Sequence, residues 1–337
     1  MFKGFANVWT PVCMSHELRR DKPLGVQVAG TKLVLFRDAE GRPAALVDRC
    51  PHRGVALSLG KVKQGCIECP FHGWQFDGKG AVCYIPWNPD AKLSKVGGIP
   101  VASREVAGQV WIYTAPDVQP TSEPAVADEL QGPQVHVSGG TTIWHTHWTR
   151  AMENMLDWPH LPFVHRKTIG RGMLQRRDSR MDIHLQEMPW GVHSTSSIDG
   201  KEQSGALDLR WPNRMNLYIS PPGKLLVMQV ACVPVDDKST RLILTSARSF
   251  LRFRLLDPIF HIMNLRIARE DKAVVESSSP AEIPPAADER SVRTDGLPLL
   301  FRKRYFQELQ SSGYDDPSVR SRRGLPVLGS GPGIDKD

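Results

Sequence analysis

Two cysteine–histidine pairs, separated by sixteen residues, limit what the N-terminal part of this chain can fold into. Cys50 and His52 form a C-x-H pair, and Cys69 and His72 form a C-x-x-H pair, within DRCPHRGVALSLGKVKQGCIECPFHGWQFD. Clustered thiolates and imidazoles are typical metal ligands. The prolines and glycines beside them allow tight loops. The spacing therefore predicts a small domain in which two loops meet at one metal centre.

Two kinds of metal centre fit these four ligands. A structural zinc ion takes four ligands tetrahedrally. The usual zinc patterns place ligands of one type together, as C-x-x-C and then H-x-H, whereas each half here carries one of each type. A [2Fe–2S] cluster with unlike irons needs two thiolates on one iron and two neutral imidazoles on the other. Two loops that each give one Cys and one His would clamp both irons, which favours the cluster over zinc.

The stretch resembles the Rieske iron–sulfur motif, C-x-H-x16-C-x-x-H, including the flanking CPHRG and CPFHGW. The resemblance implies that Cys50 and Cys69 bind one iron of a Rieske [2Fe–2S] cluster. It also implies that His52 and His72 bind the other iron.

Two further positions indicate which Rieske type the chain resembles. Respiratory-chain Rieske proteins carry two further cysteines that form a disulfide between the loops. The corresponding positions here are Val55 and Phe71, so no disulfide can form there. The resemblance is therefore to the low-potential, oxygenase type. Cys66 and Cys83 lie outside the ligand positions, and we expect them to be packing residues because free cysteine is commonly buried.

A second set of potential ligands lies in AMENMLDWPHLPFVH, which ends at His165. His160 and His165 are five residues apart, and Asp157, three before His160, shares its face on a helix. Non-haem Fe(II) oxygenases bind iron with two histidines and one carboxylate on one face of the metal. A histidine pair beside proline is more often an ordinary surface or core feature. Downstream of a Rieske motif, it predicts a mononuclear iron site.

This segment resembles the E-N-x-x-D-x-x-H-x4-H signature of the Rieske non-haem iron oxygenases, and the resemblance runs from about residue 7 to about residue 308. Glu153 and Asn154 occupy its first two places. The resemblance implies that His160 and His165 bind the iron and that Asn154 lies near it as an outer contact. It also implies that Asp157 links His160 to a Rieske histidine, His72, of a neighbouring subunit.

The third iron ligand is expected far along the chain. AREDKAVVES resembles the E-D-K-x-V-x-E stretch of single-subunit mono-oxygenases, which implies that Asp271 is the ligand. Glu270 is the adjacent alternative. Either carboxylate could instead be solvated beside Lys272, as is usual for a charged run on a helix.

The remaining pattern predicts an α+β fold: an all-β Rieske [2Fe–2S] domain followed by a helix-grip catalytic domain, an antiparallel sheet with a long C-terminal helix. We expect the Rieske domain at residues 1–118, a proline-rich acidic linker at 119–133, the catalytic domain at 134–325 and a flexible tail at 326–337. Prolines should break the helix at 148–165.

The long helix is expected at residues 255–278, with its apolar side chains on or near one face. These side chains are Leu255, Ile259, Ile262, Met263, Leu265 and Ile267. Four residues are candidates for the substrate pocket, although aromatic and methionine residues are more often plain core: Trp190, Met215, Met228 and Phe260.

The resemblance implies a terminal oxygenase that uses O2 as co-substrate at a mononuclear Fe(II). It would hydroxylate or oxidatively demethylate a small organic, aromatic or polycyclic, substrate. NAD(P)H would supply electrons indirectly, through a ferredoxin or flavin reductase. A chain of 337 residues resembles the α-only homotrimers, similar to vanillate, N-methyl and dicamba demethylases. The alternatives are a Rieske-dependent desaturase or cyclase, an electron carrier without oxygenase activity, and a zinc-stapled binding module.

The charge and the apolar runs of the chain limit the kinds of partner that we expect it to bind. The net charge is +7 with a pI near 9.1, which suits an acidic ferredoxin-type donor. No nucleic-acid module signature stands out, and no apolar run approaches the ~18–20 residues of a membrane helix. The N-terminus lacks the layout of a signal peptide. We therefore expect a cytoplasmic protein that binds neither nucleic acid nor membrane.

Overall fold

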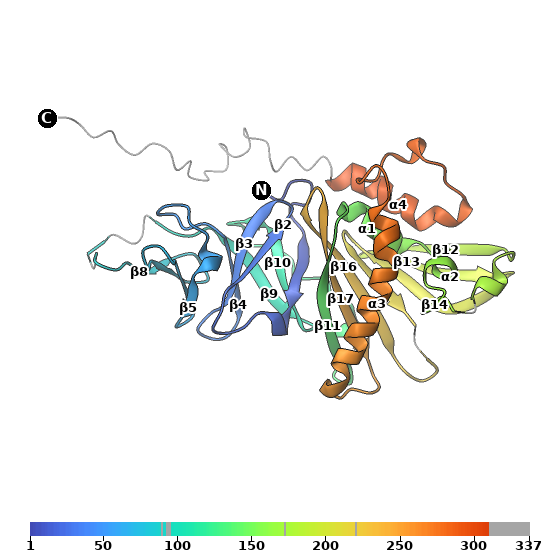
Figure 1. The fold of residues 1–337 in the computed structure, drawn as a ribbon, viewed down its shortest axis with the longest axis horizontal. Helices are drawn as coiled ribbons and strands as arrows, with labels where there is room; N and C mark the ends of the chain where they lie inside the picture. Colours follow the sequence, from blue (N-terminus) through green and yellow to red (C-terminus); the bar gives the residue numbers. More distant parts are fainter. Residues whose placement is uncertain (89, 92–95, 172, 220, 310–337) are drawn as a thin grey trace.

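The structure is a computed structural model that describes residues 1–309, apart from 89, 92–95, 172 and 220. It confirms the α+β class. Two antiparallel sheets built from the N-terminal third are followed by a larger antiparallel sheet with a long helix across it (Figure 1). The tail predicted at 326–337 lies outside the described residues.

The N-terminal part contains two sheets. The six-stranded sheet has the order β1-β10-β9-β4-β3-β2, and a four-stranded sheet has the order β5-β6-β7-β8. The bounds are β1 Trp9–Met14, β2 Leu24–Val28, β3 Thr31–Arg37, β4 Pro43–Val47, β5 Lys61–Lys63, β6 Cys66–Glu68, β7 Gln75–Phe76, β8 Val82–Tyr84, β9 Pro100–Val106 and β10 Gln109–Pro116. Gly80 lies in the turn of the β7–β8 hairpin with φ +81°, and an added Cβ would lie 2.2 Å from the Gly98 carbonyl oxygen. Only glycine fits there.

The C-terminal part is one seven-stranded sheet, in the order β11-β17-β16-β15-β14-β13-β12. Its strands are β11 His136–Trp144, β12 Met181–Met188, β13 Gly191–Ile198, β14 Lys201–Arg210, β15 Arg214–Tyr218, β16 Leu226–Asp236 and β17 Ser239–Arg248. The helices are α1 Trp148–Leu156, α2 Leu161–Val164, α3 Asp257–Glu276 and α4 Gly296–Arg304, which continues as a π turn at Tyr305–Leu309. None of the described helices is both long enough and apolar enough to span a membrane.

Buried polar contacts join the two parts of the chain. The Gln109 side-chain amide of β10 donates to the Gln229 Oε1 atom at 2.9 Å and to the Thr245 hydroxyl at 2.7 Å, on β16 and β17. One hydrophobic core also runs through both parts. Within the predicted linker, Leu130 packs with the catalytic sheet. These buried hydrogen bonds and the shared packing fix the orientation of the N-terminal sheets on the catalytic sheet.

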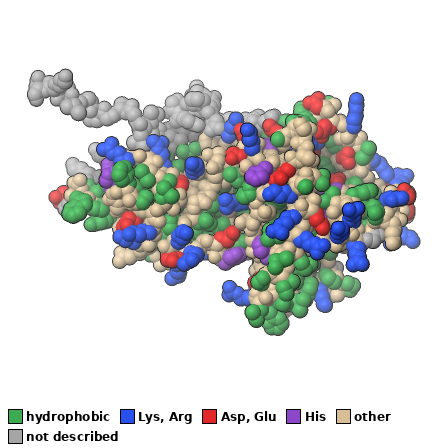
Figure 2. Space-filling view, in the orientation of Figure 1, with side chains coloured by type: hydrophobic (Ala, Val, Ile, Leu, Met, Phe, Trp, Pro, Cys, Tyr) green, Lys and Arg blue, Asp and Glu red, His purple; other side chains and the backbone are tan. Residues whose placement is uncertain are grey.

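The long helix buries a different face from the predicted one. The apolar residues expected on or near one face of the helix include four that are half or more exposed, before or within the first two turns of α3: Leu255, Ile259, Ile262 and Met263. The buried residues of α3 are Asn264, Ala268, Asp271 and Val275. Figure 2 shows the resulting apolar patch over the N-terminal end of α3. The helix turns a small and polar stripe inward because that stripe closes a cavity against the sheet.

Candidate metal centres and active site

The two predicted cluster loops have the same internal hydrogen bonds. In the first loop the Cys50 N–H donates to the Val55 carbonyl, and the Gly54 N–H donates to the Cys50 carbonyl, both at 2.8 Å. The second loop repeats the pattern: the Cys69 N–H donates to the Trp74 carbonyl at 2.8 Å, and the Gly73 N–H donates to the Cys69 carbonyl at 3.0 Å. Both glycines have positive φ, +73° and +69°. The glycines of CPHRG and CPFHG therefore permit two equivalent turns.

These loops bring the four predicted cluster ligands together. Cys50 and Cys69 are buried, and the His52 and His72 ring centroids are 4.6 Å apart. His52 stacks on the Trp74 ring at 4.5 Å between centroids with an interplanar angle of 3°. The Nδ1 atom of His52 is buried and has no hydrogen-bond partner in the described part of the chain.

Protonation at these residues suits a cluster. Burial lowers the pKa of His52, helped by the nearby His72 and Arg53 charges, so the ring is held neutral, as an iron ligand must be. Burial raises the pKa of the Cys50 thiol to about 11, against N–H groups of the His52 and Arg53 backbone that lower it. A bound iron would displace the thiol proton. The residues fit a [2Fe–2S] cluster.

The packing role expected for Cys66 and Cys83 is wrong. Cys83 is exposed and Cys66 is only partly buried, and their Sγ atoms lie 2.8 Å apart. The other two non-ligand cysteines, Cys13 and Cys232, are the buried ones. A sequence gives no sign that residues 17 positions apart will meet across an intervening strand.

Local breaks in helix geometry position the two predicted iron histidines. Helix α1 ends at Leu156, and Asp157, its C-cap residue, takes an extended backbone conformation. One turn later, His160 is the N-cap and His165 the C-cap of α2. The break confirms the expected proline interruption of the helix. Both imidazoles lie at the ends of one short turn, with ring centroids 5.2 Å apart.

Asp271 on α3 completes a group of three potential ligands. One ligand atom from each of His160, His165 and Asp271 lies within 4.8 Å of the others. The Asp271 Oδ1 atom is 3.6 Å from His160 Nε2 and 3.1 Å from His165 Nε2. Bonds of roughly 2.1 Å at right angles to a shared metal put neighbouring ligand atoms about 3 Å apart. Asp271 is 3% exposed, and its Oδ1 has no hydrogen-bond partner among the described residues. A cation satisfies that oxygen, so the residues fit a metal ion.

Two carboxylates hold the outer nitrogens of the histidines. Asp157 Oδ2 accepts from the His160 backbone N–H at 3.0 Å and pairs with its Nδ1 at 3.1 Å. Glu270 Oε2 pairs with His165 Nδ1 at 3.0 Å and accepts from the Thr168 hydroxyl at 2.6 Å. Burial lowers the pKa of His165, but the Asp271 and Glu270 carboxylates outweigh it, and the net shift is upward. Both Nε2 atoms are left to face the Asp271 carboxylate, as metal-binding histidines require.

A pocket with mostly apolar walls opens beside this group, and His160, His165 and Asp271 are among its lining residues. Its lining includes Asn154, and the Nδ2 atom of Asn154 is buried without a hydrogen-bond partner in the described part of the chain. Of the predicted pocket residues, Met215 and Met228 line this cavity. Trp190 and Phe260 do not appear in its lining. Their rings instead stack under Arg210 and Arg248, with the guanidinium carbons 3.7 Å and 4.1 Å from the ring centroids.

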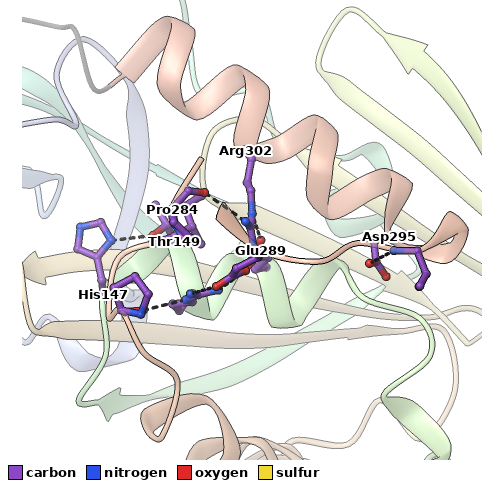
Figure 3. Close-up of polar contacts among 11 residues, drawn as sticks. His147, Thr149, Pro284, Glu289, Asp295 and Arg302 are labelled. Carbon is purple, nitrogen blue, oxygen red and sulfur yellow. Dashed lines mark hydrogen bonds and ion pairs between the residues drawn. The ribbon is translucent and has the colours of Figure 1, made fainter. Parts of the chain in front are cut away.

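The first residue of the signature, Glu153, belongs to a charge cluster with two arginines, Arg150 and Arg302. Figure 3 shows Arg302 and Glu289 of this cluster. Arg150 and Arg302 both pair with Glu153 and with Glu289, joining α1 to α4 and to the segment between α3 and α4. The hydrogen bond from Arg150, helped by Arg302 and opposed by burial, lowers the pKa of Glu289 to about 2. The contribution of the Glu289 carboxylate to folding stability is therefore present above about pH 4.5 and is lost as the pH falls toward 2. Glu153 thus fixes the helix that carries Asn154.

Replacing one arginine of this cluster is expected to destabilise the protein. Arg302→Met leaves two partly buried carboxylates with one cation, which costs about 3 kcal/mol of unfolding free energy. The matched control is Lys303→Met, since Lys303 is the exposed neighbour on α4. Differential scanning calorimetry should show a clear fall in the unfolding midpoint for Arg302→Met alone. Equal midpoints for the two variants would show that the cluster contributes nothing to stability.

Comparison with known proteins places this chain in a family. Residues 8–100 match the Rieske [2Fe-2S] domain, and residues 211–309 match the vanillate O-demethylase oxygenase C-terminal domain. Methylxanthine N3-demethylase NdmB of Pseudomonas putida is 31% identical over 326 residues, which cover 91% of this chain and 90% of the relative. Chlorophyllide a oxygenase of Chlamydomonas reinhardtii is 28% identical over 289 residues, or 81% of this chain, but the match spans only 43% of that protein.

A solved structure agrees over nearly the whole chain. The QL mutant of Pseudomonas putida CBB5 NdmA with theobromine superimposes with a TM-score of 0.79 and 26% identity, and the match covers 92% of each chain. Three findings point to the same family: the N-terminal Rieske match, the C-terminal oxygenase match and the relative that matches over most of its length. The chain is an oxidoreductase and belongs to the Rieske non-haem iron oxygenases.

Proposed function

We propose that this protein is the terminal oxygenase of a multicomponent mono-oxygenase that hydroxylates or oxidatively demethylates a small, uncharged aromatic or heterocyclic molecule. One observation carries the proposal: the two histidines and Asp271 stand in the wall of a largely apolar cavity. A metal that only stabilised the fold would need no such space beside it. The similar demethylases support the choice between hydroxylation and demethylation as the reaction class.

His160, His165 and Asp271 would hold a mononuclear Fe(II), and Cys50, Cys69, His52 and His72 would hold the Rieske cluster. Iron bound by two imidazoles and one carboxylate on one face leaves positions where O2 and substrate meet. The protein's own contribution is orientation. Asp157 and Glu270 fix the rings of His160 and His165 by holding their Nδ1 atoms. Helix α3 shuts water away from the Asp271 carboxylate, since Asp271 is buried.

The cavity walls indicate the substrate class. They are mostly aliphatic side chains and methionines, with no lysine or arginine among the described lining residues: Met155, Leu161, Ile169, Leu207, Met215, Leu217, Met228, Val230, Leu244, Ile267 and Ala268. Apart from the metal group and Asp157, the polar lining residues are Asn154 and Asn264. A substrate carboxylate would be buried there with no lysine or arginine to pair with it, at a cost of several kcal/mol. The cavity therefore suits a neutral molecule whose polar atoms meet amides.

The placement of the two sites supports a homotrimer. Strands β5 and β8, which belong to the sheet that carries the second cluster loop, lie at one end of the long axis of the molecule. Helix α2 lies toward the other end (Figure 1). A head-to-tail trimer would place the cluster of one subunit beside the iron of the next. Exposed apolar side chains surround the cluster end: Leu59, Phe71, Tyr84 and Trp87. Exposed apolar groups of this kind mark protein interfaces.

We further propose a ferredoxin or flavin reductase, fed by NAD(P)H, as the electron donor, and a cytoplasmic location. The net charge of +7 favours an acidic donor through electrostatic steering. A desaturase or cyclase would use the same metal sites, and product analysis separates those outcomes from oxygen insertion.

Metal analysis combined with nitric oxide binding tests the proposed function. Anaerobically purified protein should contain about three irons and two sulfides per chain, because a [2Fe–2S] cluster accounts for two of the irons. The third iron should bind nitric oxide and give an S = 3/2 electron paramagnetic resonance signal. Neutral N-methyl or O-methyl heteroaromatics should perturb this signal, and matched compounds carrying a carboxylate should not. Two irons per chain and no nitric oxide signal after addition of Fe(II) would show that the protein is only an electron carrier.

A further inference from the structure

A pair of cysteines outside both metal sites lies in the four-stranded sheet that carries the second cluster loop. Cys66 begins β6 and Cys83 is in the middle of β8, and β7 separates these strands in the sheet. Cys83 is the bulged residue between the Gln75–Tyr84 and Phe76–Val82 pairs. Its Sγ atom lies 2.8 Å from the Sγ atom of Cys66. A disulfide requires about 2.05 Å between the sulfurs, so a shift of roughly 0.8 Å would bring them to bonding distance.

The pair is open to reagents in solution, unlike the other non-ligand cysteines. Cys83 is exposed and Cys66 partly exposed, whereas Cys13 and Cys232 are buried. Proximity and access are the two conditions that thiol–disulfide exchange needs. Neither cysteine is among the proposed cluster ligands.

We propose that Cys66 and Cys83 form a reversible intrachain disulfide that clamps the β7–β8 hairpin onto β6 and so slows loss of the cluster. Strand β6 leads directly into Cys69, the first residue of the second cluster loop. A covalent link from β8 to β6 limits the opening of that loop, because the hairpin can no longer separate from the strand that precedes it.

The oxidant is a low-molecular-weight disulfide such as oxidised glutathione. A thiolate of the pair attacks one sulfur of glutathione disulfide, forms a mixed disulfide and releases one glutathione. The second protein thiolate attacks its partner's sulfur in the mixed disulfide and releases the second glutathione. Two protein thiols thus lose two electrons and two protons, and one glutathione disulfide becomes two glutathiones.

Exchange at this site is expected to be slow at neutral pH. Although Cys83 is exposed overall, partial desolvation of its sulfur, together with the neighbouring Cys66 thiol, raises the pKa of Cys83 to about 12. Since the thiolate is the attacking species, the reaction should quicken as the pH rises. The site must therefore be brought to equilibrium over many hours under anaerobic conditions.

Peptide mapping of the cluster-containing protein tests the clamp. Protein incubated with oxidised or reduced glutathione is alkylated and digested with trypsin without reduction. The oxidised sample should give peptide 64–79 joined to peptide 80–92, with fragmentation placing the bond between Cys66 and Cys83. The link should disappear with dithiothreitol. Only alkylated peptides in the oxidised sample, or a bond placed at Cys69, would overturn the proposal.

Cluster lifetime tests the effect of the bond. In the presence of an iron chelator, the visible absorbance of the cluster should decay at least about twofold more slowly in wild-type protein treated with oxidised glutathione than in wild-type protein treated with reduced glutathione. Cys83→Ser is the matched variant, because it removes the clamp farther from the ligands than Cys66→Ser does. Its decay should be the same after either glutathione treatment. A cross-link that leaves the wild-type lifetime unchanged would rule out the clamp.

Discussion

Asp271→Ala is expected to remove the mononuclear iron and leave the Rieske cluster in place. Iron should fall from about three to about two per chain, with sulfide unchanged at about two, and O2-dependent turnover should fall at least about 1,000-fold because the reacting metal is lost. The reason is the burial of Asp271 with an unpartnered Oδ1 facing the Nε2 atoms of His160 and His165. A buried carboxylate of this kind requires a cation. Inductively coupled plasma analysis and the cluster's electron paramagnetic resonance signal measure both sites on one sample.

Glu270→Gln is the matched control, since Glu270 is the adjacent alternative ligand. Its carboxylate contacts the far side of the His165 ring and the Thr168 hydroxyl, which is an orienting position. The variant should keep about three irons, and its turnover should fall about 10-fold, as is usual when a partner of a ligating histidine is lost. If Glu270→Gln loses the third iron and Asp271→Ala keeps it, Glu270 is the iron ligand and Asp271 is not.

The cluster loops could be predicted because their information is local. Each loop is a run of five or six residues in which the cysteine, the histidine and one positive-φ glycine fix a turn, so the spacing in the sequence carries most of the geometry. The break between α1 and α2 was predictable for the same reason, from the prolines around His160. These features need no knowledge of distant residues.

Features that depend on tertiary packing could not be predicted in this way. Helical periodicity indicated an apolar inward face for α3, but the sheet presents a cavity, and the helix turns Asn264, Ala268 and Asp271 toward it. The preference for Asp271 over Glu270 came from resemblance, since both are carboxylates on one helix. Only the rotation of α3 against the sheet places Asp271 beside the histidines.

The charge cluster on Glu153 shows the same limit more sharply. Its partner Arg302 lies 149 residues away on α4, and nothing near Arg302 in the sequence marks it as a partner. The place of Asn264 in the cavity wall was weakly indicated by its spacing, because it lies seven residues before Asp271 and so shares the same face of the helix. The packing role expected for Cys66 and Cys83 is wrong because a general preference of cysteine for burial does not say where two particular side chains lie in a sheet.

Asp157→Asn separates two roles for the residue beside His160. In the local role, Asp157 only caps the turn and orients the imidazole, through its contacts with the His160 backbone N–H and Nδ1. In the proposed bridging role, it also pairs with the exposed His72 of a neighbouring subunit and carries electrons between the metal sites. The side chain of Asp157 is 26% exposed, so it is within reach of a partner from outside.

Asparagine keeps an oxygen that can accept from His160 but loses the negative charge and one acceptor, so it preserves the local role and impairs the bridge. We expect Asp157→Asn to retain about three irons per chain and to accept electrons into the cluster at the normal rate. Single-turnover oxidation of the reduced cluster by O2 and substrate should slow at least about 100-fold, because a hydrogen-bonded path between subunits is lost. Asp157→Ala, which also frees His160, should in addition weaken iron binding. If Asp157→Asn oxidises its cluster as fast as wild type, the residue acts only on His160, and electrons cross between subunits by another route.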